Sequence, residues 1–293
     1  MAAPKFKAFL KLFIKLAVTA ICLWYVSLKI DWSKSIETIT HSNVLWLLPA
    51  IILFATSKIV ASIRLNIYFK NISVFLTEKV NLKLYWLGMF YNLFLPGGIG
   101  GDAYKVILLN KKYNHSAKLL SAAVLLDRIS GVVGLAILGA VFYYLVYNGA
   151  SYSLLILVTV FPAVLLFYFF VKIFFPSFVT GFWPALWLGL AVQLLQVFCA
   201  YTILFALHLN ENESEYILIF LLSSIVAILP FTIGGFGARE IVFVWGSAQF
   251  SLNQNQSVSI SITFYLITLV ISFIGVYWVY KNPLENKKVL NAV

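Results

Sequence analysis

Two glycine-rich segments carry the residues whose types and spacing could perform chemistry in this chain. One runs from Leu95 to Lys105 and the other from Leu229 to Arg239; each contains a Leu-Pro pair, a Gly-Gly step and a final cation. Proline lacks an amide donor and glycine tolerates non-helical dihedrals, so we expect a helix to break at each segment. Matched interruptions in two halves of a membrane protein are a strong sequence indication of a transport site.

The chemistry expected at such breaks is the binding of an anion. Broken helix ends present free backbone amides and the positive end of the helix dipole, and both attract negative charge. Lys105 and Arg239 occupy equivalent positions after the two breaks; arginine can hold a phosphate in bidentate fashion, and lysine offers a point charge. The pair predicts a site for a lipid with an anionic or phosphate headgroup, whose unaided passage through hydrocarbon is costly.

Three acidic residues, Asp102, Asp127 and Glu240, lie within or near the predicted membrane, with Lys58, Lys105, Arg128 and Arg239 as available cations. Two interpretations stay open: structural ion pairs that hold the broken helices closed, or groups that bind substrate or exchange a proton. The candidate substrate-binding residues are Lys58, Asn92, Pro96, Gly100, Gly101, Asp102, Lys105, Asp127, Arg128, Pro230, Gly234, Gly235, Arg239 and Glu240.

The composition identifies the class of protein. Of 293 residues, 62% are hydrophobic and 11% are charged, and the mean hydropathy is +0.96, which is typical of a polytopic membrane protein. The net charge of +11 comes partly from lysines that flank the first and last apolar runs, so it favours cytoplasmic termini and contact with anionic lipid over nucleic-acid binding.

Neither a metal nor another cofactor is expected. The three histidines fall in separate predicted loops, and the two cysteines lie in apolar runs where packing is their expected role. The glycine segments lack the strand–helix context of a dinucleotide-binding fingerprint, and the chain has no P-loop or nucleophile elbow.

The fold expected from these patterns is an all-α polytopic membrane protein with six transmembrane helices and two oppositely oriented re-entrant helical hairpins. The hairpins are predicted over about 83–110 and 216–250, and an outer polar loop over 29–43. Within span 44–69, Arg64 is expected to snorkel to the cytoplasmic end, whereas Lys58 lies deeper. The six spans are predicted at 9–28, 44–69, 117–147, 154–175 (bent at Pro162), 184–207 and 257–280.

The spans repeat as well as the motif. A shift of 134 positions, from Leu95 to Leu229, also moves span 44–69 close to the predicted span 184–207. We therefore expect one transmembrane domain over 1–293 built from two repeats of opposite orientation, 44–147 and 178–281, the architecture on which alternating access is commonly built. Gly131, Gly134 and Gly139 predict close helix approach. Gln193 and Gln196 share one helix face and either bridge helices or touch a polar ligand.

Several separate motifs resemble one known family. Asn92 to Pro96, Gly100-Gly101-Asp102, Asp127-Arg128 with Gly131, and Pro230 to Glu240 are similar to the lysylphosphatidylglycerol synthase transmembrane-region family. The resemblance implies a lipid flippase of the bacterial inner (cytoplasmic) membrane. Lys105 stands where an arginine is expected in the family.

The soluble aminoacyl-transfer domain of bifunctional family members has no counterpart in this sequence. An aminoacyl-phospholipid and a polyprenyl-phosphate glycolipid therefore remain alternative substrates. The function expected is that of a lipid translocase, a transporter and not an enzyme. Two other functions remain possible: a lipid-linked transferase and a non-transporting membrane subunit. A lipid-linked transferase would want an acidic pair near an outer loop, but Glu211, Glu213 and Glu215 fit simple solvation. In a non-transporting subunit the charges would only hold helices together. A homo-oligomer is compatible with every reading.

Overall fold

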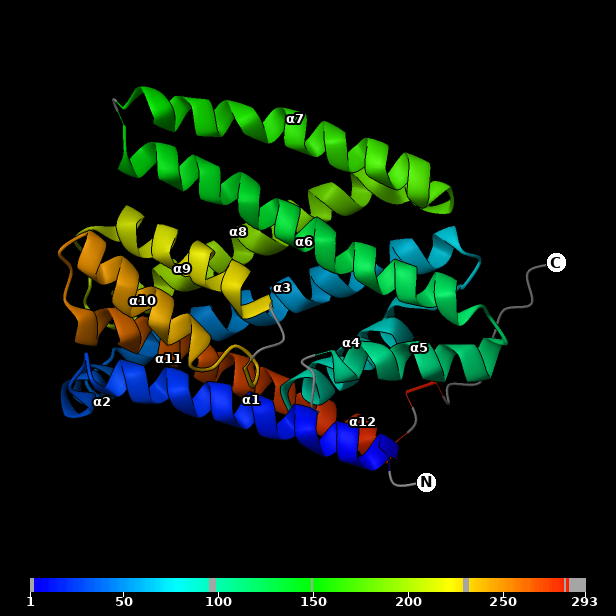
Figure 1. Ribbon diagram of the computed structural model, residues 1–293, viewed down its shortest axis with the longest axis horizontal. Coiled ribbons are helices and arrows are strands. Elements are labelled where there is room, and N and C mark those ends of the chain that lie inside the picture. Colours follow the sequence, from blue (N-terminus) through cyan, green and yellow to red (C-terminus); the bar gives the residue numbers. More distant parts are fainter. Residues whose placement is uncertain (1–2, 95–98, 149, 229–231, 282, 285–293) are drawn as a thin grey trace.

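The computed structural model describes residues 3–94, 99–148, 150–228, 232–281 and 283–284 (Figure 1). These residues form a bundle of helices and contain no β-strand. In chain order the elements are α1 (Ala3–Ser27), α2 (Trp32–Thr40), α3 (Val44–Asn71), α4 (Glu78–Phe94), α5 (Gly100–Tyr113), α6 (Ala117–Val146), α7 (Ser151–Phe174), η1 (Pro176–Gly181), α8 (Phe182–Ala206), α9 (Glu213–Ile228), α10 (Ala238–Gln249), α11 (Gln254–Phe273), η2 (Ile274–Val276) and α12 (Tyr277–Tyr280).

The membrane class is confirmed, and the number of candidate spans is five to six. Among the described residues, α3, α6, α7, η1 with α8, and α11 to α12 are long and apolar enough to cross a membrane. A sixth span requires counting Leu16–Ser27 together with α2, and these two helices are bent by 91°. The prediction of six full spans is therefore met only if this bent pair is one of them.

The bundle contains two pairs of shorter helices, and within each pair a glycine-rich segment separates the first helix from the second. α4 packs beside α5, and α9 packs beside α10. Figure 1 shows the two pairs at opposite ends of the bundle, with the end of α4 and the end of α9 both near the middle of its long axis. The element order of long helix, broken pair and long helix thus occurs twice, in α3 to α6 and in α8 to α11. Entry into the membrane from opposite faces, and the division into inverted repeats, stay predictions.

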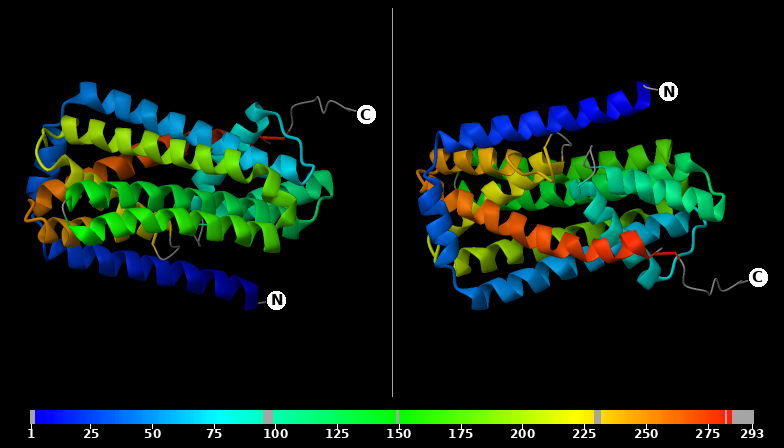
Figure 2. Two further views of the ribbon diagram at one scale, coloured as in Figure 1. Left: turned by 90° about the horizontal axis from the view of Figure 1, so that it is seen from above. Right: turned by 90° about the horizontal axis from the view of Figure 1, so that it is seen from below.

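The long helices pack tightly around the breaks. α3 and α8 form the most extensive helix contact, and α6 lies against α8. A Cβ atom at Gly134 would lie 3.0 Å from the carbonyl oxygen of Gly189, so close approach of α6 to α8 is confirmed there. Gly139 differs, because nothing lies within 4 Å of its Cβ position. α1 lies along one side of the bundle and α3 along the opposite side (Figure 2).

One local expectation was wrong. Residues 29–43, predicted as a polar loop, contain α2, whose first turn is capped by Asp31 accepting a hydrogen bond from the Ser33 amide. α2 packs on α11, and Ser35 is buried where its hydroxyl donates to the Asn255 carbonyl at 3.1 Å. Its serines and threonines serve caps and helix contacts and do not mark irregular chain. α7 continues through Pro162 as one helix, and a bend at this residue stays a prediction.

Candidate functional site

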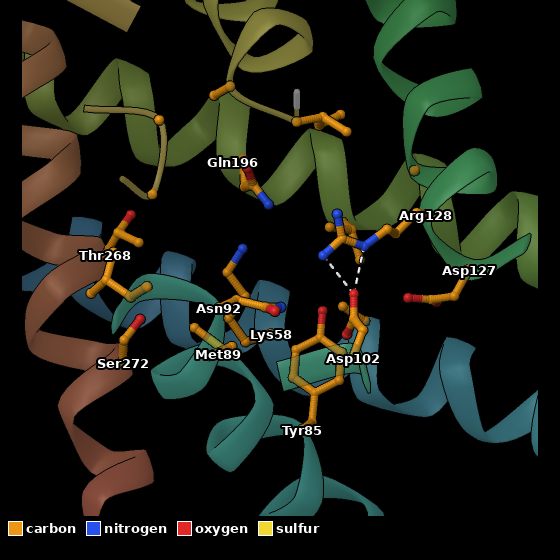
Figure 3. A pocket seen from close by; sticks show the side chains of 18 of the residues that line it. Lys58, Tyr85, Met89, Asn92, Asp102, Asp127, Arg128, Gln196, Thr268 and Ser272 are labelled. Carbon is orange, nitrogen blue, oxygen red and sulfur yellow. Dashed lines mark hydrogen bonds and ion pairs between the residues drawn. The ribbon is translucent and has the colours of Figure 1, made fainter. Parts of the chain in front are cut away.

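A cavity of about 320 Å³ lies between the two helix breaks (Figure 3). Its walls come from α3, α4, α5, α6 and α8, from the end of α9, from the segment before α10, and from α11. Its charged and amide-bearing lining residues are Lys58, Arg64, Asn92, Asp102, Lys105, Asp127, Arg128, Gln193 and Gln196. Six of these were predicted as site residues, and three were not: Arg64, Gln193 and Gln196.

Asp102 binds two cations on one wall of the cavity. Its Oδ1 accepts a hydrogen bond from Lys105 Nζ at 3.0 Å, one turn further along α5. Its Oδ2 lies 2.5 Å from both Nε and Nη2 of Arg128, which comes from α6 (Figure 3). The Lys105 ammonium also lies 4.6 Å from the centroid of the Tyr85 ring. The carboxylate therefore ties α5 to α6 and neutralises part of the positive charge of the cavity.

Arg64 is the main correction to the sequence-based site. It does not snorkel: its side chain is 6% exposed, and its Nε donates to Asp127 Oδ1 at 2.7 Å. Asp127 thus pairs with a residue of α3 that was not among the cations expected for it. Room for the guanidinium exists because Gly131 has no side chain; a Cβ atom there would lie 3.3 Å from Arg64 Nη1. That Nη1 atom is buried and has no hydrogen-bond acceptor within the described chain.

Lys58 and two glutamines complete the polar lining. Lys58 takes part in none of the ion pairs within the described residues, and its Nζ lies 4.3 Å from the centroid of the Phe54 ring. Gln193 donates to the Gly131 carbonyl at 3.1 Å and so bridges α8 to α6, one of the two roles expected for it. In Figure 3, Lys58, Gln196 and Arg128 enter the cavity from three different helices.

The first break is held by contacts between α4 and α5. Asn92 Oδ1, at the end of α4, accepts a hydrogen bond from the Gly101 amide at 2.8 Å. A Cβ atom at Gly101 would collide with the carbonyl oxygen of Gly88, so this glycine is needed for helix packing. Gly100 begins α5, and Pro96 lies outside the described residues. The Gly101 amide, expected to be open to an anion, is already used internally.

The second break brings glycines with left-handed backbone to the cavity. Gly234 and Gly235 line it with φ values of +60° and +86°, which residues with a side chain rarely adopt. A Cβ atom at Gly234 would collide with the side chain of Leu93 at the end of α4, so the two breaks meet at this point. Pro230 lies outside the described residues.

Arg239 and Glu240 lie beside the cavity and do not line it. Glu240 is fully buried, and its carboxylate accepts hydrogen bonds from the Gly237 amide at 2.6 Å and the Ser261 hydroxyl at 2.8 Å. Arg239 donates to Ser224 Oγ at 3.2 Å, and its guanidinium carbon lies 4.9 Å from the centroid of the Phe264 ring. Lys105 and Arg239 therefore do not face one cavity in the equivalent way that their spacing predicted.

The balance of charge favours an anionic ligand. Four cationic side chains and two carboxylates line the cavity, so both carboxylates can be paired while positive charge remains. A low-dielectric recess with an excess of one sign concentrates ligands of the other sign. The described residues contain no group of three or more histidines, cysteines or acids that could hold a metal ion.

Comparison with known proteins adds an independent finding. A sequence model of the family described as the lysylphosphatidylglycerol synthase TM region matches residues 12–275. Over 129 residues the chain is 26% identical to the UPF0104 membrane protein PH1989 of Pyrococcus horikoshii, a match that covers 43% of this chain and 37% of that protein. The family match includes both helix breaks and every residue of the charged cavity. The chain therefore belongs to the lysylphosphatidylglycerol synthase transmembrane-region family.

Proposed function

We propose that this protein translocates a lipid with an anionic or phosphate headgroup across the membrane that it spans. The observation that carries the proposal is the charged cavity between the two helix breaks, where cations outnumber carboxylates four to two. Lys58 is the cation of this cavity with no carboxylate partner among the described residues, and in this proposal it binds the headgroup.

A second observation supports an oxygen-rich ligand. The Nη1 group of Arg64 is a buried donor without an acceptor in the described chain. A buried unpaired donor is costly, so such a group is expected to meet a partner in part of the working cycle. A phosphate oxygen fits this donor, because hydrogen bonds between guanidinium and phosphate are among the strongest in proteins.

The route of transport in this proposal is alternating access. The broken pairs α4–α5 and α9–α10 act as re-entrant hairpins of an inverted repeat, and the headgroup passes between them. Broken helices are tolerated at membrane depth where they line a cavity, and both breaks border this one. α1 begins and α12 ends at the same end of the bundle (Figure 1), which supports termini on one side, the cytoplasm of a bacterial inner membrane in this proposal.

Flipping of a fluorescent phosphatidylglycerol by the purified protein in liposomes tests the proposal. Wild type should accelerate loss of protected fluorescence after a membrane-impermeant quencher is added, and it should act less on a phosphatidylcholine probe. Lys58→Met should slow flipping about tenfold, because one charge-assisted contact to the headgroup is lost. Lys70→Met is the matched control, since Lys70 is exposed and lies outside the cavity.

The outcomes separate the rival functions. Wild-type liposomes no faster than empty ones would contradict translocation, and unchanged flipping by Lys58→Met would remove the cavity from the pathway. Turnover of a lipid-linked donor, detected by mass spectrometry of the extracted lipids, would instead favour a transferase.

A further inference from the structure

An apolar groove of about 370 Å³ lies on the side of the bundle formed by α6, α7 and α9. Its floor is α6, where Ala136, Gly139 and Ala140 present little or no side chain, and its walls include Val160 of α7 and Leu222 of α9. No atom lies within 4 Å of the Cβ position of Gly139, so this glycine does not serve helix packing. It leaves the floor of the groove open.

The groove continues toward the end of the bundle where α2 lies. A smaller hollow of about 110 Å³ shares Tyr143, Leu218 and Leu222 with it and extends to Tyr147. Together the two hollows follow α6 from Val133 to Tyr147, roughly 21 Å of helix at a rise of 1.5 Å per residue. That length exceeds one leaflet of a hydrocarbon core about 30 Å thick. The groove is therefore long enough for an extended acyl chain.

The other end of the groove reaches the charged cavity. Leu218, Leu222, Ile225 and Ile228 follow one face of α9 at helical spacing; the first three line the groove, and Ile228 lines the cavity. On α6, Gly131 lines the cavity and Val133 lines the groove, two positions apart and therefore on different faces of the helix. Within one helical turn of α9, the apolar surface of the groove gives way to the polar site.

We propose that this groove holds an acyl chain of the lipid whose headgroup enters the cavity, an inference that rests on the proposed function. A headgroup drawn between the helix breaks carries its tail with it, and the tail needs an apolar path that adjoins the cavity. Lipid tails are as apolar as leucine side chains, so moving a chain from the bilayer into the groove gains little by itself. The groove aligns the tail, and the cations of the cavity provide the affinity.

Photolabelling tests the site directly and without transport. The probe is a phosphatidylglycerol with a photoactivatable group at the middle of one acyl chain, added to the full-length protein in liposomes. Labelled peptides should concentrate on residues 133–143 and 218–225, and excess unlabelled phosphatidylglycerol should reduce this labelling more than phosphatidylcholine does. Labelling spread evenly over the lipid-facing helices, or labelling of the groove that phosphatidylcholine reduces as much as phosphatidylglycerol does, would overturn the inference.

Filling the groove gives the second test. Gly139→Trp should place a ring in the open floor and slow flipping at least tenfold, with an unchanged elution profile in detergent. Val158→Trp is the matched control, because Val158 is 59% exposed on α7 and does not line the groove. Normal flipping by Gly139→Trp would overturn the groove but not the proposed function. Selective labelling of a wild type that does not flip lipid would sustain the groove and contradict translocation.

Discussion

The two broken helix pairs, α4–α5 and α9–α10, both have an acidic residue in the first turn of their second helix, but this residue makes different contacts in the two pairs. In both α5 and α10 the third helical residue is acidic, Asp102 in one and Glu240 in the other. Glu240 reaches back to the Gly237 amide and caps its own helix. Asp102 has one methylene fewer, and it binds Lys105 of its own helix and Arg128 of α6.

This difference shows which second helix is held by hydrogen bonds within itself and which is held by its neighbours. A glutamate at this position accepts a hydrogen bond from the amide of Gly237 at the start of its own helix, so this amide of α10 is satisfied locally. The start of α5 depends on its neighbours: Asn92 of α4 binds the Gly101 amide, and Arg128 of α6 binds Asp102. We expect α4–α5 to respond to a headgroup in the cavity and α9–α10 to remain the fixed wall.

Removal of the carboxylate at Asp102 should have the largest effect on stability. Asp102→Ala leaves two cations without this partner, and breaking a buried ion pair costs about 3–5 kcal/mol. Asp102→Asn, which keeps one acceptor oxygen, should cost less. The free energy of unfolding from denaturant titration in detergent measures both. A smaller loss for Asp102→Ala than for Glu240→Ala would break the comparison.

Loss of the cap at Glu240 should come second. Glu240→Ala leaves the Gly237 amide and the Ser261 hydroxyl without their acceptor in a fully buried site, at a cost of about 1–3 kcal/mol. The same titration measures it, with Glu240→Gln as the control that retains an acceptor oxygen. Equal losses for alanine and glutamine would show that charge, and not the cap, is what this residue contributes.

The sequence could predict the class, most of the helices and the breaks, because each depends on local properties. Apolar composition identifies membrane helices, and a cluster of proline and glycine ends a helix whatever its tertiary surroundings. Most of the charged cavity could also be anticipated, since Lys58, Asp102 and Lys105 stand close to a break or deep in a span.

The partners across helices could not be predicted. Arg64 pairs with Asp127 because α3 and α6 meet on one particular face, and spacing along α3 says nothing of that face. A Cβ atom at Gly101 would collide with the backbone of Gly88, and one at Gly88 would collide with the side chain of Lys105. These contacts between α4 and α5 cannot be read from either motif. The duplicated motif suggested equivalent roles for Lys105 and Arg239, but Arg239 packs over Phe264 instead.

Replacing Glu240 of the α9–α10 pair by aspartate tests whether side-chain length decides which acid caps its own helix. Glu240→Asp should lose the bond to the Gly237 amide, as the aspartate at the same position of α5 makes no such cap. Loss of an N-terminal cap costs about 0.5–2 kcal/mol. Hydrogen exchange of the first amides of α10 should rise in this variant and stay unchanged in the first turn of α5. Unaltered exchange at Gly237 would show that the shorter acid still caps.

The smallest effect on the free energy of unfolding is expected for an exposed ion pair at the start of the α4–α5 pair. Lys70 and Glu78 form an ion pair at 3.0 Å at the start of α4, with side chains 47% and 48% exposed. Such pairs are worth about 0–1 kcal/mol and are screened by salt, so Lys70→Ala should change the free energy of unfolding little, and less at high ionic strength. The same measurement on Lys105→Ala, which removes a buried partner of Asp102, should give a several-fold larger loss. If the two alanine variants lost equal stability, charged pairs of α4–α5 would contribute to stability irrespective of their burial. The contrast between α4–α5 and the self-capped α9–α10 pair would then not be explained by the buried charges of the cavity.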